Sequence, residues 1–396
     1  DAPAWVCQFI RLRQEMDCWI RNSLELQRQV PFLGHHDEGA FLASWLCHYQ
    51  LTRQPEIIEF ARELRDGYAC WAEQNLVHGF SPAGEVHHQT EVLTQFLARL
   101  WHVSPDDKTA GLILDAAEHV GNWVPNVPEW YDWDQNRFVA WQVGTCEVGS
   151  DGSFYEVPDH FRLIQLALAA FAVSQDQRYL DLSLRWTRRW AEMILDTDGA
   201  PPDMLGTQTE GDSAESAVDR GASRAGTGRV GKVEPFVAAG AIDVLLDLYG
   251  LVGEAVFANA ARNLCSVLVE EVADPYANPV GALLYRYRVE VGDTSLDTRI
   301  MGALAGATFE LPGEPVLILE RPPVGPLRGV GKRYDMVRWA YRDERGQLIP
   351  ESSPPPSSLM LAYQITGSVE FAVRALELAA SRLALARSAL RDGRRH

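Results

Sequence analysis

A short pattern recurs along the chain, in every copy but one between two segments with helical periodicity. It consists of an aromatic residue, any residue, an apolar residue and a small or turn-forming residue. Five copies begin at Tyr49, Trp101, Phe171, Tyr249 and Tyr363, and a sixth, at Phe309, lies in the long interval before the last. A repeated supersecondary unit cannot bury its apolar face alone, so consecutive copies stack. The repeat therefore predicts six helical hairpins.

The segments around each copy favour helices. Apolar residues recur at intervals of three and four, and Ala and Leu are abundant, as in residues 161–171 and 237–249. The first helix of each hairpin is the more apolar and should lie inside, whereas the charged second helix should face water. We expect an all-α fold, an (α/α)6 barrel in which residues 1–396 form one toroidal domain. A helix within residues 1–30 should close the ring.

The connections within hairpins are short, but those between hairpins are long and irregular. They cover residues 77–85, 125–158, 197–232, 274–297 and 322–356. In alternating hairpins these links gather at one end of the barrel, and long connections in a compact domain are usually functional. We therefore place the site at that end. A plain helical solenoid, the alternative, would have short loops at both ends.

Bulk composition excludes several classes of protein. The 396 residues carry a net charge of −18, which disfavours binding to nucleic acid or to an anionic membrane. No apolar run is long enough for a transmembrane helix, and the N-terminal residues lack a signal-peptide pattern. A cytoplasmic or periplasmic location is expected. The six cysteines show no metal-binding spacing and are interpreted as reduced core residues.

Polar clusters precede the expected inner helices. They are His35-His36-Asp37, then His87-His88 followed by Glu91, then Asp159-His160. Asp at a helix start is often only a cap, but capping does not explain two His-His pairs at equivalent places in successive hairpins. Adjacent histidines diverge on a helix, and no His-x3-His spacing is present, so we expect neither a metal nor a cofactor. A metal held by histidine together with Asp37 or Glu91 from different hairpins is the alternative. The histidines should donate hydrogen bonds to a polar ligand or transfer a proton.

The connection over residues 124–157 is rich in aromatic and acidic residues. Part of it alternates like a strand, which predicts a small β-hairpin over the barrel mouth. Aromatic faces beside carboxylates suit sugar rings, whose C–H faces stack while their hydroxyls bond to acids. Candidate substrate-binding residues are Trp130, Asp132, Trp133 and Trp141. The alternative is a small hydrophobic cluster beneath the loop.

Two further segments bear on the ligand. Residues 197–232 have almost no apolar anchors and predict a flexible lid or insertion. Late in the chain, the segment 285–288 together with Arg333 and Tyr334 adds cations and hydroxyls, which suggests a carboxylate or sulfate on the ligand. Solvated loop charge would also account for these residues.

With six hairpins and a mouth rich in Trp, His and Asp, residues 5–390 resemble the six-hairpin (α/α)6 glycosidase superfamily. Its smaller members include unsaturated glucuronyl hydrolases, and related toroids include polysaccharide lyases and N-acylglucosamine 2-epimerases. The resemblance implies a carbohydrate-active enzyme whose partner is an oligosaccharide or polysaccharide. It is architectural, and no family's catalytic residues carry over to this chain.

The leading expectation is a glycoside hydrolase that acts on an acidic, uronate-containing sugar through carboxylate acid and base groups. The candidate catalytic residues are His88, Glu91, Asp37, Asp159 and His160, and His35, His36 and His87 should bind the sugar. We place His88 at the centre, flanked by carboxylates. A polysaccharide lyase with a His or Tyr base is the first alternative. A sugar epimerase and a glycan-binding toroid without activity follow it.

Overall fold

The repeated aromatic residues lie where helices end at short turns. The computed structural model describes residues 3–36, 38–149, 155–196, 205–206, 233–307, 314–319 and 337–389. The carbonyls of Tyr49, Phe171, Tyr249 and Tyr363 each accept an N–H from the residue four positions later. These cap residues, Arg53, Gln175, Gly253 and Gly367, have left-handed backbones with φ of 57–72°. One left-handed residue ends each helix and starts the turn, which explains the recurring pattern. The expected place of these aromatics at the short turns is confirmed, except for Phe309, which lies outside the described residues.

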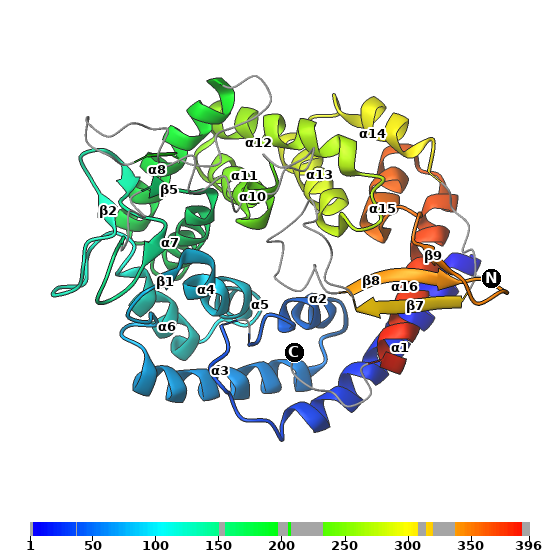
Figure 1. Cartoon of the computed structure of the whole chain (residues 1–396), viewed down its shortest axis with the longest axis horizontal. Coiled ribbons are helices and arrows are strands. Elements are labelled where there is room, and N and C mark those ends of the chain that lie inside the picture. Colours follow the sequence, from blue (N-terminus) through cyan, green and yellow to red (C-terminus); the bar gives the residue numbers. More distant parts are fainter. Residues whose placement is uncertain are drawn as a thin grey trace.

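The described chain is mostly helical, and its long helices form consecutive antiparallel pairs. The pairs are α2 (Leu42–Thr52) with α3 (Pro55–Asn75), α4 (Val86–Glu91), η1 (Val92–Leu97) and α5 (Ala98–Val103) with α6 (Asp107–Ala117), α7 (Phe161–Ser174) with α8 (Gln177–Asp196), α11 (Ala241–Val252) with α12 (Ala255–Leu268), and α15 (Pro356–Thr366) with α16 (Val369–Ala389). In the fifth pair, α13 (Asn278–Val291) is followed by the short α14 (Asp297–Leu304), which contacts η4 (Val269–Glu271) and α15. Figure 1 shows the pairs arranged around a ring, with the first helix of each pair on its inner side.

Neighbouring inner helices contact one another in chain order. Contacts join α2 to α5, α4 to α7, α7 to α11, α11 to α13, and α13 to α15. Most buried apolar side chains belong to one continuous cluster that extends from Ile20 to Ala362. The more apolar first helices thus provide the shared interior, as the sequence predicts.

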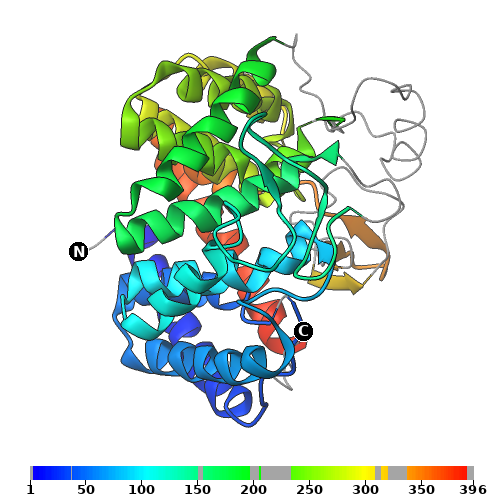
Figure 2. The ribbon, with the colours of Figure 1, turned by 90° about the vertical axis from the view of Figure 1, so that its left-hand side faces the viewer.

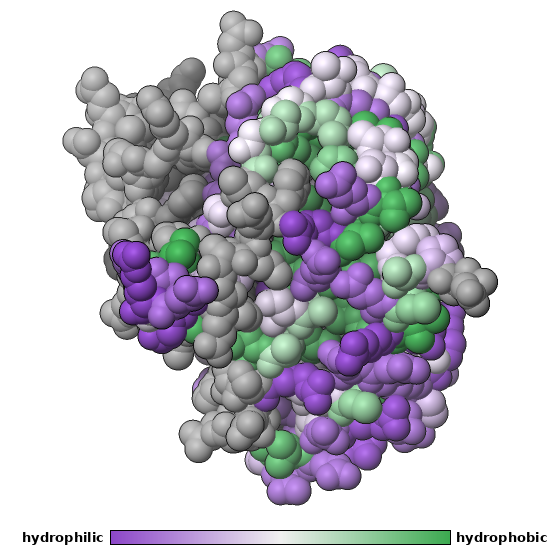
Figure 3. Space-filling view, turned by 90° about the vertical axis from the view of Figure 1, so that its right-hand side faces the viewer, coloured by the Kyte–Doolittle hydropathy of each residue, from purple (hydrophilic) through white to green (hydrophobic). Residues whose placement is uncertain are grey.

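The N-terminal helix α1 (Ala4–Gln27) packs against both α16 and α3. It therefore contacts both the last helical pair and the first. Its outer surface exposes Phe9, Ile10 and Leu26. In the view onto this side of the molecule, hydrophobic and hydrophilic patches lie side by side (Figure 3).

The fifth pair differs from the expectation. Residues 274–297, expected to be a long loop, contain helix α13, which begins with Pro279 in its first turn and ends at Gly292 with φ +72°. Val280, Leu284 and Tyr287 are buried at helical spacing. The arginines expected at the mouth are engaged elsewhere, because Arg286 pairs with Asp243 and Asp247 of α11 and Arg288 pairs with Asp297 at the start of α14.

Short strands occur in the long connections. β2 (Tyr131–Asp132) and β3 (Arg137–Phe138) form the expected small β-hairpin, whereas β4 (Gln142–Val143) pairs with β1 (Gly84–Glu85) and β5 (Tyr155–Glu156) pairs with β6 (Leu205–Gly206). An unexpected antiparallel sheet consists of β7 (Glu314–Leu319), β8 (Val337–Arg342) and β9 (Leu348–Pro350). Figure 2 shows that these strands gather at one end of the molecule. Of the expected lid, residues 197–232, only Leu205–Gly206 lies within the described part of the chain.

The second inner helix contains a π-helical stretch. η1 interrupts the regular α-helical hydrogen bonding between α4 and α5. Such π segments are rare, and each corresponds to one residue inserted into an α-helix. The extra residue changes how the first turn of α4 is oriented relative to α5.

Candidate functional site

Three imidazole rings form a row beside the first turn of α4. The ring centroids of His36 and His88 are 4.2 Å apart, and those of His88 and His87 are 3.8 Å apart. His36 comes from the segment before α2, whereas His87 and His88 begin the second inner helix. Their side chains are 22–37% exposed, so the row is open to a ligand from solvent.

Carboxylates flank this row. At one end, Glu91 Oε2 is 3.0 Å from His36 Nδ1. At the other end, Asp159 Oδ2 is 3.7 Å from His87 Nδ1. Between them, Glu85 Oε2 lies 3.5 Å from His87 Nδ1 and 3.8 Å from His88 Nδ1. Acidic oxygens thus approach all three rings.

The local electrostatics differ along the row. Loss of hydration raises the pKa of the Asp159 carboxyl, the nearby Glu85 charge raises it further, and Arg162 and His160 oppose the rise. The Nε2 atom of His88 is enclosed and has no hydrogen-bond partner among the described residues. A bound oxygen atom would supply a partner for that nitrogen.

The segment that carries His36 is held by a carboxylate and by a glycine. Glu38 accepts the N–H groups of Leu33 and Gly34 at 2.8 and 3.1 Å. Gly34 has φ +86°, and a Cβ atom there would lie 2.3 Å from the Trp71 ring. Only glycine satisfies both the backbone conformation and this close approach.

The start of α4 is held by Gln89. Its Oε1 accepts the N–H of Ser81 at 3.0 Å, and its Nε2 donates to Ser81 Oγ at 2.7 Å and to the carbonyl of Val143 at 3.2 Å. These bonds join the helix to β4, which in turn pairs with the strand that contains Glu85. Glu85 and the two histidines therefore have a common support.

The structure brings together five of the residues expected from sequence. They are His36, His87, His88, Glu91 and Asp159. His35 is exposed in the segment next to His36. Asp37, Arg333 and Tyr334 lie outside the described residues.

The expected catalytic role of His160 needs correction. Its ring is fully buried and stacks on Phe138 at 4.8 Å. Nε2 donates to the carbonyl of Ala140 at 2.9 Å, and Nδ1 accepts the N–H of Val157 at 3.1 Å. Burial lowers the pKa of this imidazole, so it remains neutral. His160 supports the loop before α7 and does not face a ligand.

Most of the expected aromatic platform is also absent, because the rings form the core of their own loop. Trp130 is 1% exposed, stacks on His119 and donates from Nε1 to the carbonyl of Gly144. Trp133 donates to the carbonyl of Gly121 and packs against Tyr131. These two residues form the hydrophobic cluster that the sequence left as an alternative.

Two members of the expected sugar-binding set remain near the surface. The side chain of Asp132 accepts the N–H groups of Asp134 and Gln135 at 3.0 Å, so it shapes the β-hairpin turn. Trp141 is half-buried and stacks on Tyr155 with ring centroids 6.1 Å apart. Of the four, Trp141 keeps the character of a sugar-stacking surface.

Sequence reasoning missed Glu85 as a site residue. It precedes the paired histidines by two and three positions, and this closeness in sequence could have identified it as a site residue. Contrary to the expectation that adjacent histidines diverge, single ligand atoms from Glu85, His87 and His88 all lie within 4.8 Å of one another. The extended conformation of Glu85 at the helix start directs its side chain back over both rings.

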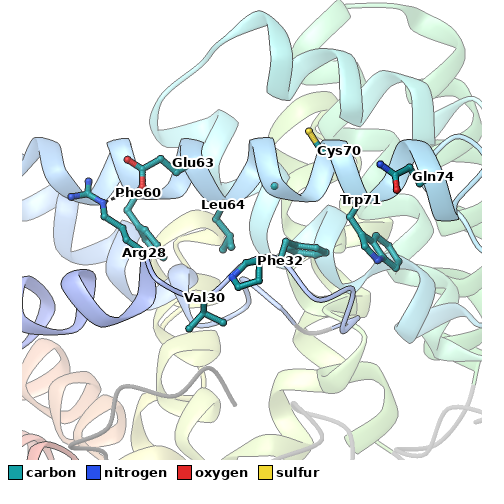
Figure 4. A pocket seen from close by; sticks show the side chains of 11 residues that line it. Arg28, Val30, Phe32, Phe60, Glu63, Leu64, Cys70, Trp71 and Gln74 are labelled. Atoms are coloured by element: carbon teal, nitrogen blue, oxygen red, sulfur yellow. Dashed lines mark hydrogen bonds and ion pairs between the residues drawn. The ribbon is translucent and has the colours of Figure 1, made fainter.

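A pocket of about 390 Å³ lies elsewhere, between α3 and the segment that joins α1 to α2. Figure 4 shows its wall, which includes Phe32, Leu64 and Trp71, with Arg28 and Glu63 joined at one side. This wall includes only one carboxylate and no imidazole. Its chemistry is poorer than that of the histidine row, so we place the candidate site at the row.

No protein-family model, curated protein or solved structure matches this chain. Among the described residues, no helix has the length and apolar character needed to cross a membrane.

Proposed function

We propose that this protein is a glycoside hydrolase acting on a uronate-containing oligosaccharide. The observation that supports it is the row of imidazoles with Asp159 at one end and the Glu91–His36 pair at the other. Hydrolysis of a glycosidic bond requires a group that protonates the leaving oxygen and a group that activates water. The two ends of the row offer one candidate for each task.

In this proposal, Glu91 holds His36 through Nδ1, which leaves Nε2 to take a proton from a water molecule. A carboxylate that orients an imidazole in this way also stabilises the imidazolium that forms. Asp159 donates a proton to the leaving oxygen at the other end. His87 and His88 donate hydrogen bonds to sugar oxygens, and the enclosed Nε2 of His88 gains the partner it lacks.

Although the carboxylates of Glu85, Glu91 and Asp159 oppose an anionic ligand, two features support an acidic substrate. The imidazoles are nitrogen donors that attract carboxylates, most strongly when protonated. The N-terminus of α4 lies at the row, and helix N-termini carry partial positive charge. Trp141 with Tyr155 offers an aromatic surface for a sugar ring.

We infer that the helical pairs form a six-hairpin (α/α)6 barrel with residues 1–396 as one domain. The ring in Figure 1 and the continuous core support this classification. β7 and β8, with α1 and α16, occupy the interval between the last and first inner helices in that view. The likeness to six-hairpin glycosidases and uronate-active toroids is the basis for the proposed substrate class.

The test is sugar release from uronate-containing and neutral oligosaccharides by purified variants. Asp159→Asn and His36→Gln should each lower kcat by about 100-fold or more while the thermal midpoint changes little. His102→Gln, on an exposed residue at the end of α5, is the matched control. A folded Asp159→Asn variant with full activity would contradict the assigned role.

A polysaccharide lyase is the second candidate, favoured by the Glu91–His36 pair. An oriented imidazole is suited to removing the proton next to a uronate carboxylate. A lyase produces an unsaturated uronate that absorbs ultraviolet light, whereas a hydrolase does not. An increase in absorbance that is lost in His36→Gln would replace the hydrolase proposal with this one.

A further inference from the structure

We propose that Glu85, His87 and His88 form a binding site for a divalent transition metal, with Zn²⁺ as the best fit. This inference goes beyond the proposed function and does not depend on it, because metal binding is measured without any sugar.

The spacing of the ligand atoms supports the site. In tetrahedral zinc sites each bond is about 2.0–2.2 Å, which places neighbouring ligand atoms roughly 3.3–3.5 Å apart. Glu85 Oε2 lies 3.5 Å from His87 Nδ1 and 3.8 Å from His88 Nδ1. All three ligand atoms lie within 4.8 Å of one another. Small side-chain rotations would therefore bring them around one ion.

Asp159 is a nearby carboxylate, although it is not one of the three residues whose ligand atoms cluster. Asp159 Oδ2 is 3.7 Å from His87 Nδ1, a similar separation to that of Glu85. Asp159 comes from η3 (Pro158–His160), so an ion that also bound Asp159 would join the starts of two neighbouring inner helices. If Asp159 remains uncoordinated, one position stays open to water or to a ligand oxygen, as in catalytic zinc sites.

The chemistry of the donors indicates which metal. Two imidazole nitrogens and one or two carboxylates suit zinc and its transition-metal neighbours, whereas calcium and magnesium prefer oxygen alone. The carboxylates offset the charge of the ion. The partial exposure of His87 and His88 gives it a path of entry.

Hydrogen bonds and strand pairing hold these residues in place for an ion. Gln89 ties the first turn of α4 to Ser81 and Val143, and β1 holds Glu85 against β4. Coordination through Nδ1 of His88 would leave its Nε2 as an N–H donor. That tautomer matches a donor role toward a bound oxygen.

The test uses the full chain after removal of metal with a chelator. Zinc titrated into the protein in a calorimeter should bind with one-to-one stoichiometry, and Co²⁺ should give the visible absorption of a tetrahedral ion. Glu85→Gln and the double variant His87→Ala/His88→Ala should weaken binding by about tenfold or more. His102→Ala should bind as the unaltered protein does.

A second measurement covers the possibility that a variant folds poorly. Excess zinc should raise the thermal midpoint of the unaltered protein and of His102→Ala, since a ligand that binds the folded state stabilises it. It should not do so for the double variant. Binding that persists in the double variant, or one-to-one binding that is absent from the unaltered protein, would overturn the proposal.

Discussion

His119 gives a quantitative test of how this fold responds to acid. Its ring is buried between Trp130, on which it stacks at 4.9 Å, and Phe80, which meets it edge-on at 5.2 Å. Burial and, to a lesser extent, the neighbouring His78 lower the pKa of His119, whereas the Val77 backbone and Asp115 oppose the change; together they bring it from 6.5 to about 4. The folded chain thus keeps this imidazole neutral where the unfolded chain would protonate it.

The direction and size of the effect follow from linkage. Because the folded-state pKa is lower than the unfolded value, stability falls as pH decreases from 6.5 toward 4. One pKa unit corresponds to about 1.4 kcal/mol, so His119 should remove about 2 kcal/mol from the free energy of unfolding between roughly pH 7 and pH 5. His119→Phe keeps an aromatic ring in the stack but cannot be protonated, so the variant should escape this loss.

The assay is urea unfolding at both pH values for the unaltered protein, His119→Phe and the exposed-residue control His102→Phe. Other groups titrate equally in all three, so the difference between proteins isolates His119. The unaltered protein and the control should lose about 2 kcal/mol more than His119→Phe. Parallel losses in all three would refute the reasoning.

Three further outcomes are expected. Glu156→Ala should lower the free energy of unfolding by about 3 kcal/mol, because this buried carboxylate accepts N–H groups of Phe138 and Trp186 at 2.7 and 2.6 Å and pairs with Arg189. Urea unfolding measures this free energy, and a loss near zero would contradict the prediction. Trp130→Phe should lower the free energy of unfolding by about 1–2 kcal/mol, because the hydrogen bond to Gly144 is lost, but should leave KM for the sugar unchanged. Trp141→Ala should raise KM with little change in the thermal midpoint. The reverse pattern would restore Trp130 as a sugar contact. Gly34→Ala should lower kcat/KM by roughly 10–100-fold by displacing His36, since its Cβ would meet Trp71, and steady-state kinetics that match the unaltered protein would disprove this.

The parts of the fold set by short-range sequence were predictable. The left-handed cap after Tyr49, Phe171, Tyr249 and Tyr363 depends on residues four positions apart, so a repeated pattern in the sequence reports it directly. Helix α13 was wrongly predicted to be a loop, because the charged residues within 285–288 obscure the helical spacing of the apolar positions that α13 buries. Pro279 in the first turn and Gly292 just after the last residue are typical of helix ends, and this pattern predicts the helix.

The candidate site also combines residues that are close in sequence with residues that are far apart in sequence. His87, His88 and Glu91 lie within one helix start, so their place at the site could be predicted, but the expected divergence of the two adjacent histidines was wrong. The approach of Asp159 to His87 and the edge-on packing of Trp130 against Phe80 join residues far apart in sequence. No local pattern distinguishes an aromatic residue that faces a sugar from one that fills the core of its own loop. For that reason Trp130 and Trp133 were assigned to the wrong environment.

The π segment Val92–Leu97 makes the orientation of the site depend on the length of a single helix. Each residue of an α-helix advances the rotation by about 100°, so removing one residue from this stretch would turn the first turn of α4 by about that amount relative to α5. His87, His88 and Glu91 would swing away from His36 and Asp159, while the apolar contacts of α5 kept their register. A change of one residue in the length of this stretch would therefore be enough to separate His87 and Glu91 from the groups that they meet in neighbouring segments.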